Sequence, residues 1–253
     1  MTTSMFDLSG KTAAISGATR GIGRAMALAL AEAGADVALL QRSAQQVEVK
    51  EEIERLGRTC HIIPCDLEDA DQVKAAVPDV VERFGSLDIL VNNAGIQRRS
   101  PSVDFLEEDW DSVLNVNLKT VWLLCQQAGR YMVPRQKGKI INVASLLSFQ
   151  GGFTVPAYAA AKGGVAQLTK ALSNEWAKHH VNVNAIVPGY IATEMNTALM
   201  NDPVRSRQIL DRIPSGRWGI PDDFKGTVVY LASDASNYVN GHLLAVDGGW
   251  LGR

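Results

Sequence analysis

Residues 12–23 read Thr12-Ala-Ala-Ile-Ser-Gly17-Ala-Thr-Arg-Gly21-Ile-Gly23, a short apolar run followed by a turn with three glycines. The run predicts a buried strand, and small residues at helical spacing over 24–33 predict a helix directly after the turn. Glycines allow the backbone to approach a phosphate, and a helix N-terminus offers free N–H groups and a positive dipole end. The spacing differs from the common Gly-x-Gly-x-x-Gly form. Strand, turn and helix together still predict a site for the pyrophosphate of a dinucleotide.

The alternation of strand and helix continues to the end of the chain. Near-continuous apolar runs such as 36–40 are typical of parallel strands covered on both faces. With right-handed crossovers, the pattern predicts an α/β fold, a Rossmann-like doubly wound parallel sheet of about seven strands, in a single domain over 1–253. The predicted strands are 12–16, 36–40, 59–64, 87–91, 139–144, 181–187 and 243–246. The predicted helices are 24–33, 44–56, 70–84, 109–133, 158–180 and 221–233, with a mobile helical excursion at 190–213.

The composition of the 253 residues excludes several classes of partner. A net charge of -2 gives no electrostatic attraction to nucleic acid or to an anionic membrane surface. No apolar run reaches spanning length, and the first residues lack a basic region followed by an apolar run. Cys60, Cys65 and Cys125 are an odd number without metal-binding spacing. We therefore expect reduced core thiols, a cytoplasmic location, no membrane contact and no metal site.

Tyr158 and Lys162 lie four residues apart in a predicted helix, so their side chains project from one face about 5–6 Å apart. A tyrosine with a pKa near ~10 is almost entirely protonated at neutral pH. A nearby ammonium group favours the phenolate and lowers that pKa. The pair is a candidate acid–base device, although the same spacing also occurs often by chance.

Six motifs occur in an order that resembles the short-chain dehydrogenase/reductase superfamily over essentially the whole chain. They are Ser16-Gly-Ala-Thr-Arg-Gly-Ile-Gly23, Asn92-Asn-Ala-Gly95, Asn117, Ser145, Tyr158-x-x-x-Lys162 and Pro188-Gly-Tyr-Ile-Ala-Thr193. Ser16 stands where the family usually has threonine, and it keeps the hydroxyl. The resemblance implies an NAD(P)-dependent short-chain alcohol dehydrogenase or ketoreductase.

The resemblance further implies that Asn117, Ser145, Tyr158 and Lys162 are the catalytic residues. Hydride transfer to a ketone leaves an alkoxide, which Tyr158 would protonate as general acid; in the oxidative direction it would act as base. Ser145 would hydrogen-bond and polarise the substrate oxygen. Lys162 would lower the pKa of Tyr158 and bind the nicotinamide ribose. Asn117 would position a water in a proton relay through Lys162.

A nicotinamide cofactor at the carboxyl ends of the strands is also implied by the resemblance. Asp66 and the Leu67 backbone would contact adenine, Asn92 would hold the turn after the fourth strand, and Ile191 and Thr193 would bind the carboxamide. The residues expected at the cofactor site are Gly17, Thr19, Arg20, Gly21, Ile22, Gly23, Arg42, Asp66, Leu67, Asn93, Ala94, Gly95, Tyr158, Lys162, Pro188, Gly189, Ile191 and Thr193.

The end of the second strand distinguishes NADP from NAD. An acidic residue there would accept the ribose hydroxyls and repel a 2′-phosphate, whereas an arginine does the reverse. The chain has Gln41-Arg42-Ser43, with no carboxylate at 41. Arg42 therefore predicts NADP, with NAD as the alternative.

Stretches at 140–152, 174–178, 212–219 and 238–250 resemble the branch of the family that acts on sugar acids such as gluconate and deoxygluconate. That branch is usually NAD-linked, unlike the prediction from Arg42. A sugar acid needs hydrogen-bonding groups and a cation for its carboxylate. We expect Ser145, Tyr158, Gln150 and Arg98, or its neighbour Arg99, at the substrate site. The alternatives are a reductase of 3-oxoacyl thioesters or another carbonyl, and an inactive nucleotide-sensing protein.

Two expectations concern the arrangement around the catalytic pair. The small residues Ala159, Ala160, Ala161, Gly163 and Gly164 would allow another helix to approach closely. With the family habit of pairing this helix across a two-fold axis, they predict a homotetramer. The segment 190–213 would lie over the nicotinamide and act as a substrate-side lid.

Overall fold

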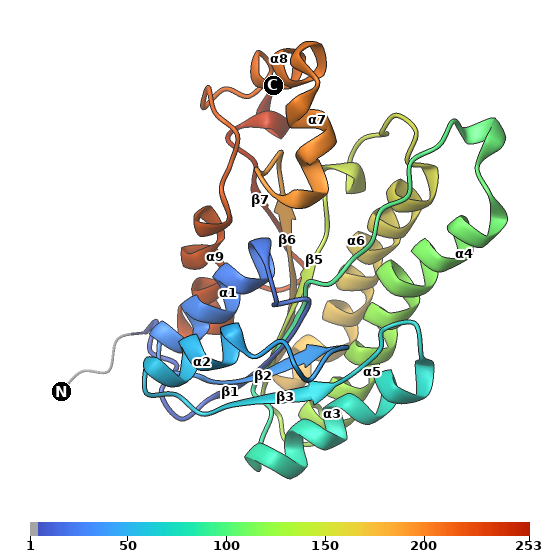
Figure 1. Ribbon diagram of the computed structural model, residues 1–253. Helices are drawn as coiled ribbons and strands as arrows, with labels where there is room; N and C mark the ends of the chain where they lie inside the picture. The colour runs from blue at the N-terminus through green and yellow to red at the C-terminus, as the bar shows by residue number, and fades with distance from the viewer. Residues whose placement is uncertain (1–4) are drawn as a thin grey trace.

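The structure, a computed structural model, describes residues 5–253, in which seven strands form one parallel sheet (Figure 1). The strand order is β3-β2-β1-β4-β5-β6-β7. The strands are β1 (Thr12–Ser16), β2 (Asp36–Gln41), β3 (Cys60–Pro64), β4 (Ile89–Asn92), β5 (Gly138–Val143), β6 (Val181–Pro188) and β7 (Leu243–Val246). The strand order reverses between β1 and β4, the switch point at which open α/β sheets bind ligands. The predicted single-domain, doubly wound α/β fold is confirmed.

Helices cover both faces of the sheet. The layer on one face consists of α1 (Gly21–Glu32), α2 (Glu48–Arg55) and α9 (Lys225–Ala232) (Figure 1). The other layer consists of α3 (Ala70–Phe84), α4 (Glu107–Leu114), α5 (Thr120–Met132) and α6 (Pro156–Trp176). Each layer forms its own apolar core with the sheet. This is why β1 and β5 are buried along their whole length, as their apolar runs predicted.

Local signals fix the ends of the helices that carry the site. Pro156 occupies the first position of α6, where the missing N–H and the fixed φ favour a helix start. In α3 the Asp69 side chain accepts hydrogen bonds from Asp71 N and Gln72 N, and Gly85 at φ 78° ends the helix. By contrast, α1 has no side-chain cap and no acidic residue in its first turn. Its N-terminal N–H groups are therefore free to face a ligand.

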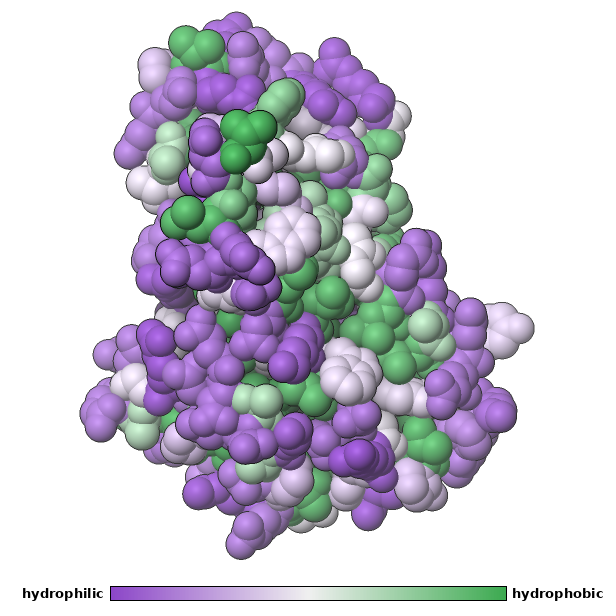
Figure 2. Space-filling model, turned by 90° about the vertical axis from the view of Figure 1, so that its right-hand side faces the viewer, coloured by the Kyte–Doolittle hydropathy of each residue, from purple (hydrophilic) through white to green (hydrophobic). Residues whose placement is uncertain are grey.

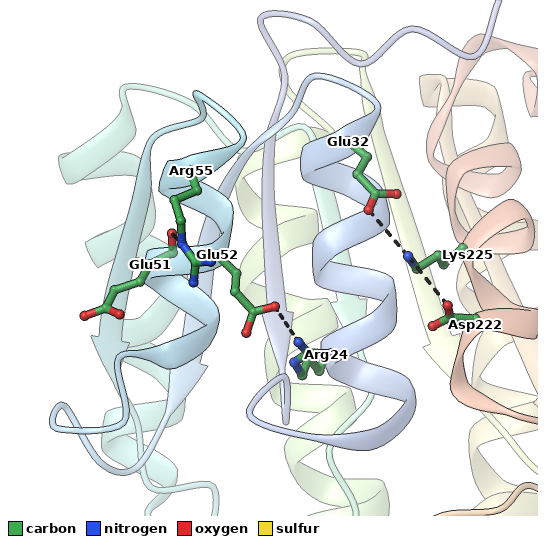
Figure 3. A network of polar contacts seen from close by, with 7 residues as sticks. All are labelled: Arg24, Glu32, Glu51, Glu52, Arg55, Asp222 and Lys225. Atoms are coloured by element: carbon green, nitrogen blue, oxygen red, sulfur yellow. Dashed lines mark hydrogen bonds and ion pairs between the residues drawn. The ribbon is translucent and has the colours of Figure 1, made fainter.

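Ion pairs join α1 to its neighbours on the outer surface (Figure 3). Arg24 of α1 pairs with Glu52 of α2. Lys225, at the start of α9, lies 3.4 Å from Glu32 of α1 and 3.8 Å from Asp222. These exposed pairs each contribute little free energy, about 0–1 kcal/mol. They tie the helix after the glycine turn to both of its neighbours.

The helix predicted over 44–56 is shorter in the structure, where α2 begins at Glu48. The reason lies in Gln41, whose Nε2 donates to Ser43 O at 2.7 Å and to Gln46 O at 2.8 Å. These bonds use two carbonyl groups in a loop conformation. The residues between β2 and α2 are thus held at the carboxyl end of the sheet.

The single helix predicted over 109–133 is three segments. Between α4 and α5 lies a π-helical turn, Asn115–Lys119. A π turn is rare and frequently marks a functional site. It contains Asn117, whose contacts are described below.

The segment 190–213 folds above the carboxyl ends of the strands, as Figure 1 shows. It contains a short 3₁₀ turn (Glu194–Asn196), α7 (Thr197–Asn201) and α8 (Pro203–Leu210). Asp202 caps α8 by accepting from Val204 N and Arg205 N. The remaining 3₁₀ turns are Ser102–Asp104, Leu146–Ser148, Ala177–His179, Pro221–Phe224, Asp234–Ser236 and Trp250–Gly252.

Candidate active site

A cleft of about 1410 Å³ lies at the carboxyl ends of the strands. Its volume exceeds the ~300–1,000 Å³ typical of a site for one small ligand, so it can hold a dinucleotide and a second molecule together. Every predicted site residue except Asn92 and Asn117 lines this cleft. Those residues are Gly17, Thr19, Arg20, Gly21, Ile22, Gly23, Arg42, Asp66, Leu67, Asn93, Ala94, Gly95, Arg98, Ser145, Gln150, Tyr158, Lys162, Pro188, Gly189, Ile191 and Thr193.

The glycine turn is fixed to the sheet by Asn93 and Ser16. Asn93 Nδ2 donates to Ser16 O at 3.0 Å and to Gly17 O at 2.9 Å. Ser16 Oγ accepts from the backbone N–H groups of Asn93 and Ala94 at 3.2 Å each, so the hydroxyl that serine shares with threonine is in use. A Cβ on Gly23 would lie 2.2 Å from Gly17 O, which explains why this position is glycine.

Asn92 was expected to hold the turn after β4, but its side chain points away from that turn. Its Nδ2 donates to Asn142 Oδ1 at 2.9 Å, inside the sheet, and contacts Cys125 Sγ at 3.2 Å. As the last residue of β4, Asn92 points into the core between β4 and β5. Asn93, one residue later on the opposite side, is the residue whose side chain holds the glycine turn.

The cofactor end of the cleft fits a dinucleotide. The uncapped N-terminus of α1 can receive a pyrophosphate. Opposite it, a Cβ on Gly21 would lie 3.6 Å from Thr193 Cγ2, so both walls are near each other. Gln41 Oε1 is a buried acceptor without a partner among the described residues, next to Arg42 at the end of β2. A ribose hydroxyl could donate to this oxygen.

Ser145, from the loop after β5, comes together with Tyr158 and Lys162 of α6. Lys162 is 3% exposed, and its Nζ donates to Val143 O at 2.5 Å. The same Nζ lies 5.6 Å from the centre of the Tyr158 ring, and the Ser145 side chain hydrogen-bonds to Tyr158. Ser145 Oγ also accepts from Leu147 N at 3.2 Å, which makes it the cap of the following turn. The predicted helical pairing of Tyr158 with Lys162 is therefore present.

Burial shifts the acid–base groups in directions the sequence did not predict. It raises the pKa of Tyr158 to about 12, against the smaller opposing effects of the Ser145 hydrogen bond and the Arg99 charge. Burial also lowers the pKa of Lys162 to about 8. The expected lowering of the Tyr158 pKa by Lys162 is thus not produced by the protein's own groups. A further positive charge beside the phenol is needed to bring its pKa toward neutral pH.

Asn117 lies behind the cleft wall rather than in it. Its side chain is fully buried, Oδ1 accepts from Ile96 N at 2.8 Å, and Nδ2 donates to Ile96 O at 2.7 Å. A Cβ on Gly95 would lie 3.1 Å from Asn117 Oδ1 and 3.9 Å from Lys162 Nζ. Asn117 therefore clamps the backbone beside the Lys162 ammonium, with both ends of its amide in use.

The other end of the cleft is rich in arginine. Arg98, the predicted carboxylate ligand, pairs with Asp109 at 3.1 Å, and Arg99 donates to Gln97 Oε1 at 2.8 Å. Sequence reasoning missed two more arginines that line the cleft, Arg205 and Arg212. Arg212 lies within the stretch 212–219, which resembles the sugar-acid branch, and this resemblance was the signal that could have pointed to Arg212. Trp250 lies at the end of another such stretch, 238–250.

The charges that line the whole cleft are mostly positive, although the chain has a net charge of -2. The acidic side chains in the lining lie toward the cofactor end or pair with Arg20, as Glu194 does. The lining contains the basic residues Arg20, Arg42, Arg98, Arg99, Lys162, Arg205 and Arg212 and the acidic residues Asp66, Glu68 and Glu194. Such a concentration of positive charge attracts anionic ligands.

Three further observations concern the cysteines, possible metal ligands and the character of the helices. Cys60, Cys65 and Cys125 are free and buried. Within residues 5–253, no group of three or more His, Cys, Asp or Glu side chains could hold a metal ion. None of the helices in that range has the length and apolar character needed to cross a membrane.

Comparisons with known proteins agree with this geometry. A family model described as enoyl-(acyl carrier protein) reductase matches residues 17–251. The chain is 53% identical over 250 residues to a 2-dehydro-3-deoxy-D-gluconate 5-dehydrogenase of Pseudoalteromonas atlantica, covering 98% of both. It is 49% identical over 254 residues to the protein of that name from Escherichia coli, covering 100% of both.

A solved structure shares the fold at the same level of similarity. This is a putative 2-deoxy-D-gluconate 3-dehydrogenase from Agrobacterium tumefaciens with bound NADP, with a TM-score of 0.94 and 47% identity over 99% of this chain and 100% of that one. Family model, relatives and structure each cover nearly the full length. The chain belongs to the short-chain dehydrogenase/reductase family and is a nicotinamide-dependent oxidoreductase.

Proposed function

We propose that the protein transfers a hydride between NADP and a secondary alcohol or ketone of a sugar acid, such as a gluconate or a deoxygluconate. The observation that carries this proposal is the arginine-rich end of the cleft. Arg98, Arg99, Arg205 and Arg212 line it, and of these only Arg98 has an acidic ion-pair partner within residues 5–253. Unpaired guanidinium groups suit the carboxylate of a sugar acid. The names of the relatives support the same substrate class.

The protein's groups would divide the work as follows. Tyr158 protonates the oxygen of the reduced carbonyl, or takes the proton in the oxidative direction. Ser145, which hydrogen-bonds to Tyr158, donates to the same substrate oxygen and polarises it. Lys162 binds the nicotinamide ribose. When bound, the cofactor supplies or accepts the hydride, and its oxidised ring adds a positive charge that favours the phenolate of Tyr158.

Asn117 would act through the backbone that it holds. The side-chain amide of Asn117 bonds to both the N–H and the carbonyl group of Ile96, so Asn117 fixes the cleft wall beside Lys162 Nζ. The predicted proton relay would then pass along this wall, with its water placed by the clamped backbone. Asn117 is a positioning residue in this scheme.

For the cofactor we propose NADP. Arg42 lines the cleft at the end of β2 without an acidic partner within residues 5–253, and a 2′-phosphate would give it one. Ser43 and Gln46 line the same corner. NAD stays the alternative, since Gln41 Oε1 could accept from a ribose hydroxyl in either cofactor.

We also propose a homotetramer. Figure 2 looks onto the side that carries α4–α6 and shows hydrophobic residues gathered in its middle. A second hollow on the molecule is lined by apolar side chains that include Leu118, Trp122 and Leu168, and Trp122 is 42% exposed. Of the small residues on α6, Ala161 is fully buried and Gly164 approaches Leu118 within the subunit. Ala159, Ala160 and Gly163 would meet the partner. Sedimentation of a monomer at micromolar concentration would contradict this assembly.

The protein would be cytoplasmic, since its three buried cysteines are reduced.

The segment 190–213 would close over the bound ligands as a lid. A bridge between Ile191 and Gly219 and the ion pair of Arg20 with Glu194 hold the start of the segment against the body. Limited proteolysis with and without NADP and substrate would test closure. Equal cleavage within 190–213 in both states would contradict it.

The proposed function is tested by following NAD(P)H absorbance. Purified protein is assayed with 2-dehydro-3-deoxy-gluconate, gluconate, 2-deoxygluconate and their keto forms, in parallel with a 3-oxoacyl thioester. We expect turnover of at least one sugar acid with NADP. Turnover of the thioester alone would favour the alternative reductase. Binding of NAD(P) with no measurable turnover of any substrate, and therefore no activity for Tyr158→Phe to abolish, would favour a nucleotide-sensing protein.

A further inference from the structure

Three residues far apart in the sequence meet at the substrate end of the cleft. Gln150 follows Ser145 in the loop after β5, Arg212 ends the segment 190–213, and Trp250 follows β7. Gln150 Oε1 accepts from Trp250 Nε1 at 3.3 Å and from Arg212 Nη2 at 3.4 Å. The Arg212 guanidinium stacks on the Trp250 ring, 4.1 Å from its centre. All three line the same cleft as Tyr158.

Trp250 is the fixed member of this cluster. It is 4% exposed, and its ring packs 4.7 Å from that of Tyr190. The turn that carries it is held by Asp247, whose carboxylate accepts from Gly249 N at 2.8 Å and from Leu251 N at 2.9 Å. A buried ring on an ordered turn is a rigid support, so Arg212 loses little freedom when it binds a ligand.

The cluster offers hydrogen-bond donors. The acceptor of Gln150 is shared by two donors from the protein, whereas its Nε2 has no partner among the described residues. Arg212 uses one N–H group on Gln150 and has no acidic partner within residues 5–253. A carboxylate is an acceptor with no hydrogen to donate, and a guanidinium binds it through two parallel bonds. The free groups of Gln150 and Arg212 therefore match a carboxylate.

The remaining arginines at this end have other surroundings. Arg98 is paired with Asp109. Arg99 donates to Gln97 Oε1 at 2.8 Å, and its charge slightly opposes the raised pKa of the Tyr158 phenol. Arg205 stacks on Phe153, whose side chain is 80% exposed. In the reaction named for the 5-dehydrogenase relatives, the reacting carbon lies near the end of the carbon chain opposite the carboxylate, so the carboxylate ligand need not lie beside Tyr158.

We propose that Arg212 and the Gln150 amide bind the substrate carboxylate and that Trp250 is a positioning residue that holds both. This inference rests on the proposed function and names the groups that select acids. Its consequence is that the carboxylate contacts the 190–213 segment and the loop after Ser145 at the same time. Arg212 and Gln150 are therefore specificity residues, and Trp250 is the positioning residue that orients them.

The test compares a sugar acid with its carboxamide, in which the charge is removed and the chain is kept. Arg212→Gln should lower kcat/KM for the acid about 10- to 100-fold and leave the carboxamide nearly unchanged. Arg212→Lys should recover part of the preference, since a lysine keeps the charge without the paired geometry. Arg207→Gln is the matched control, because Arg207 lies on the same segment, pairs with Asp211 and does not line the cleft.

The role of Trp250 is tested by a split between KM and kcat. Trp250→Phe keeps a ring under Arg212 and removes the N–H that orients Gln150. It should raise KM for the acid about 3- to 10-fold with kcat and the NADP Kd unchanged, whereas Trp250→Ala should lose the preference for the acid. A general loss of stability would instead change the carboxamide and the acid alike.

Three results would overturn the inference. The first is that Arg212→Gln lowers kcat/KM equally for the acid and the carboxamide. The second is that Arg99→Gln or Arg205→Gln loses the preference for the acid over the carboxamide, while Arg212→Gln keeps it. A third is a wild-type protein that turns over both compounds equally. In these three cases turnover of sugar acids, and with it the proposed function, still stands. A wild-type protein without activity on any sugar acid overturns both.

Discussion

The two ends of the cleft are built differently. At the cofactor end, Ser16 and Asn93 fix the glycine turn to the sheet through bonds of 2.9–3.2 Å to backbone groups. At the substrate end, Arg205 and Arg212 come from a peripheral segment and contact aromatic rings and polar side chains. A fold that anchors the cofactor and leaves substrate contacts to peripheral segments can keep one reaction while its substrate changes.

The strongest test of this division removes the group that both ends share. Tyr158→Phe deletes the acid–base hydroxyl and should lower kcat about 10²- to 10⁴-fold. The NADP Kd, measured by calorimetry, should change by less than about 10-fold because the glycine turn is untouched and only one hydroxyl is lost. Tyr230→Phe, on α9, serves as control. A parallel loss of cofactor affinity would show that the two ends are not separable.

A second test uses the buried ammonium between the two ends. Burial lowers the pKa of Lys162 from its usual 10.5 to about 8, so the folded state binds fewer protons than the unfolded state between these values. Its contribution to the free energy of unfolding therefore rises with pH from about 8 to 10.5, by about 3 kcal/mol in total. The free energy of unfolding of wild type and Lys162→Met is measured in urea at pH 7, 8.5 and 10. The variant's free energy of unfolding relative to wild type should fall as pH rises. A pH-independent difference would contradict the buried charge.

A third test changes the anchored end alone. Gly23→Ala would place a Cβ 2.2 Å from Gly17 O. Thermal unfolding should show a loss of about 1–3 kcal/mol, and the NADP Kd should rise at least ~10-fold as the turn shifts. The KM for the sugar acid at saturating NADP should change little. Gly226→Ala is the matched control, since its added Cβ meets nothing within 4 Å. Equal effects of both changes would remove the case for a tight turn.

The smallest expected effect is at the adenosine corner. Arg42→Ser removes the cation proposed for the 2′-phosphate and should raise the NADP Kd about 10-fold through loss of a charged hydrogen bond. NAD lacks that phosphate, so its Kd is an internal control and should not change. Fluorescence titration of NADPH and NADH measures both. Unchanged NADPH binding would favour NAD as the working cofactor.

The same division explains how much the sequence could predict. The glycine turn, the strand ends and the spacing of Tyr158 and Lys162 depend on local signals, and the structure contains all of them. The start of α2 depends on Gln41 binding two carbonyl groups of the following loop, which no local propensity reveals. The direction of the Tyr158 pKa shift depends on burial, which the four-residue spacing does not contain.

The surroundings of the arginines were equally beyond the sequence. Arg98 or its neighbour Arg99 was predicted at the carboxylate, and the pairing of Arg98 with Asp109 becomes visible only when the loop and α4 are placed together. Arg212 stacks on Trp250, which lies 38 positions later in the chain, after the end of β7. Residues whose role depends on distant partners are the ones that local patterns miss.

The π turn at Asn115–Lys119 has a consequence for engineering. A π turn holds one more residue than the α turn it replaces, so deleting a single residue there would let α4 and α5 join as one regular helix. Such a helix would have better backbone geometry, yet Asn117 would rotate away from Ile96 and release it. If Asn117 positions the cleft wall as proposed, a search for thermostable variants that repairs this turn would select against activity.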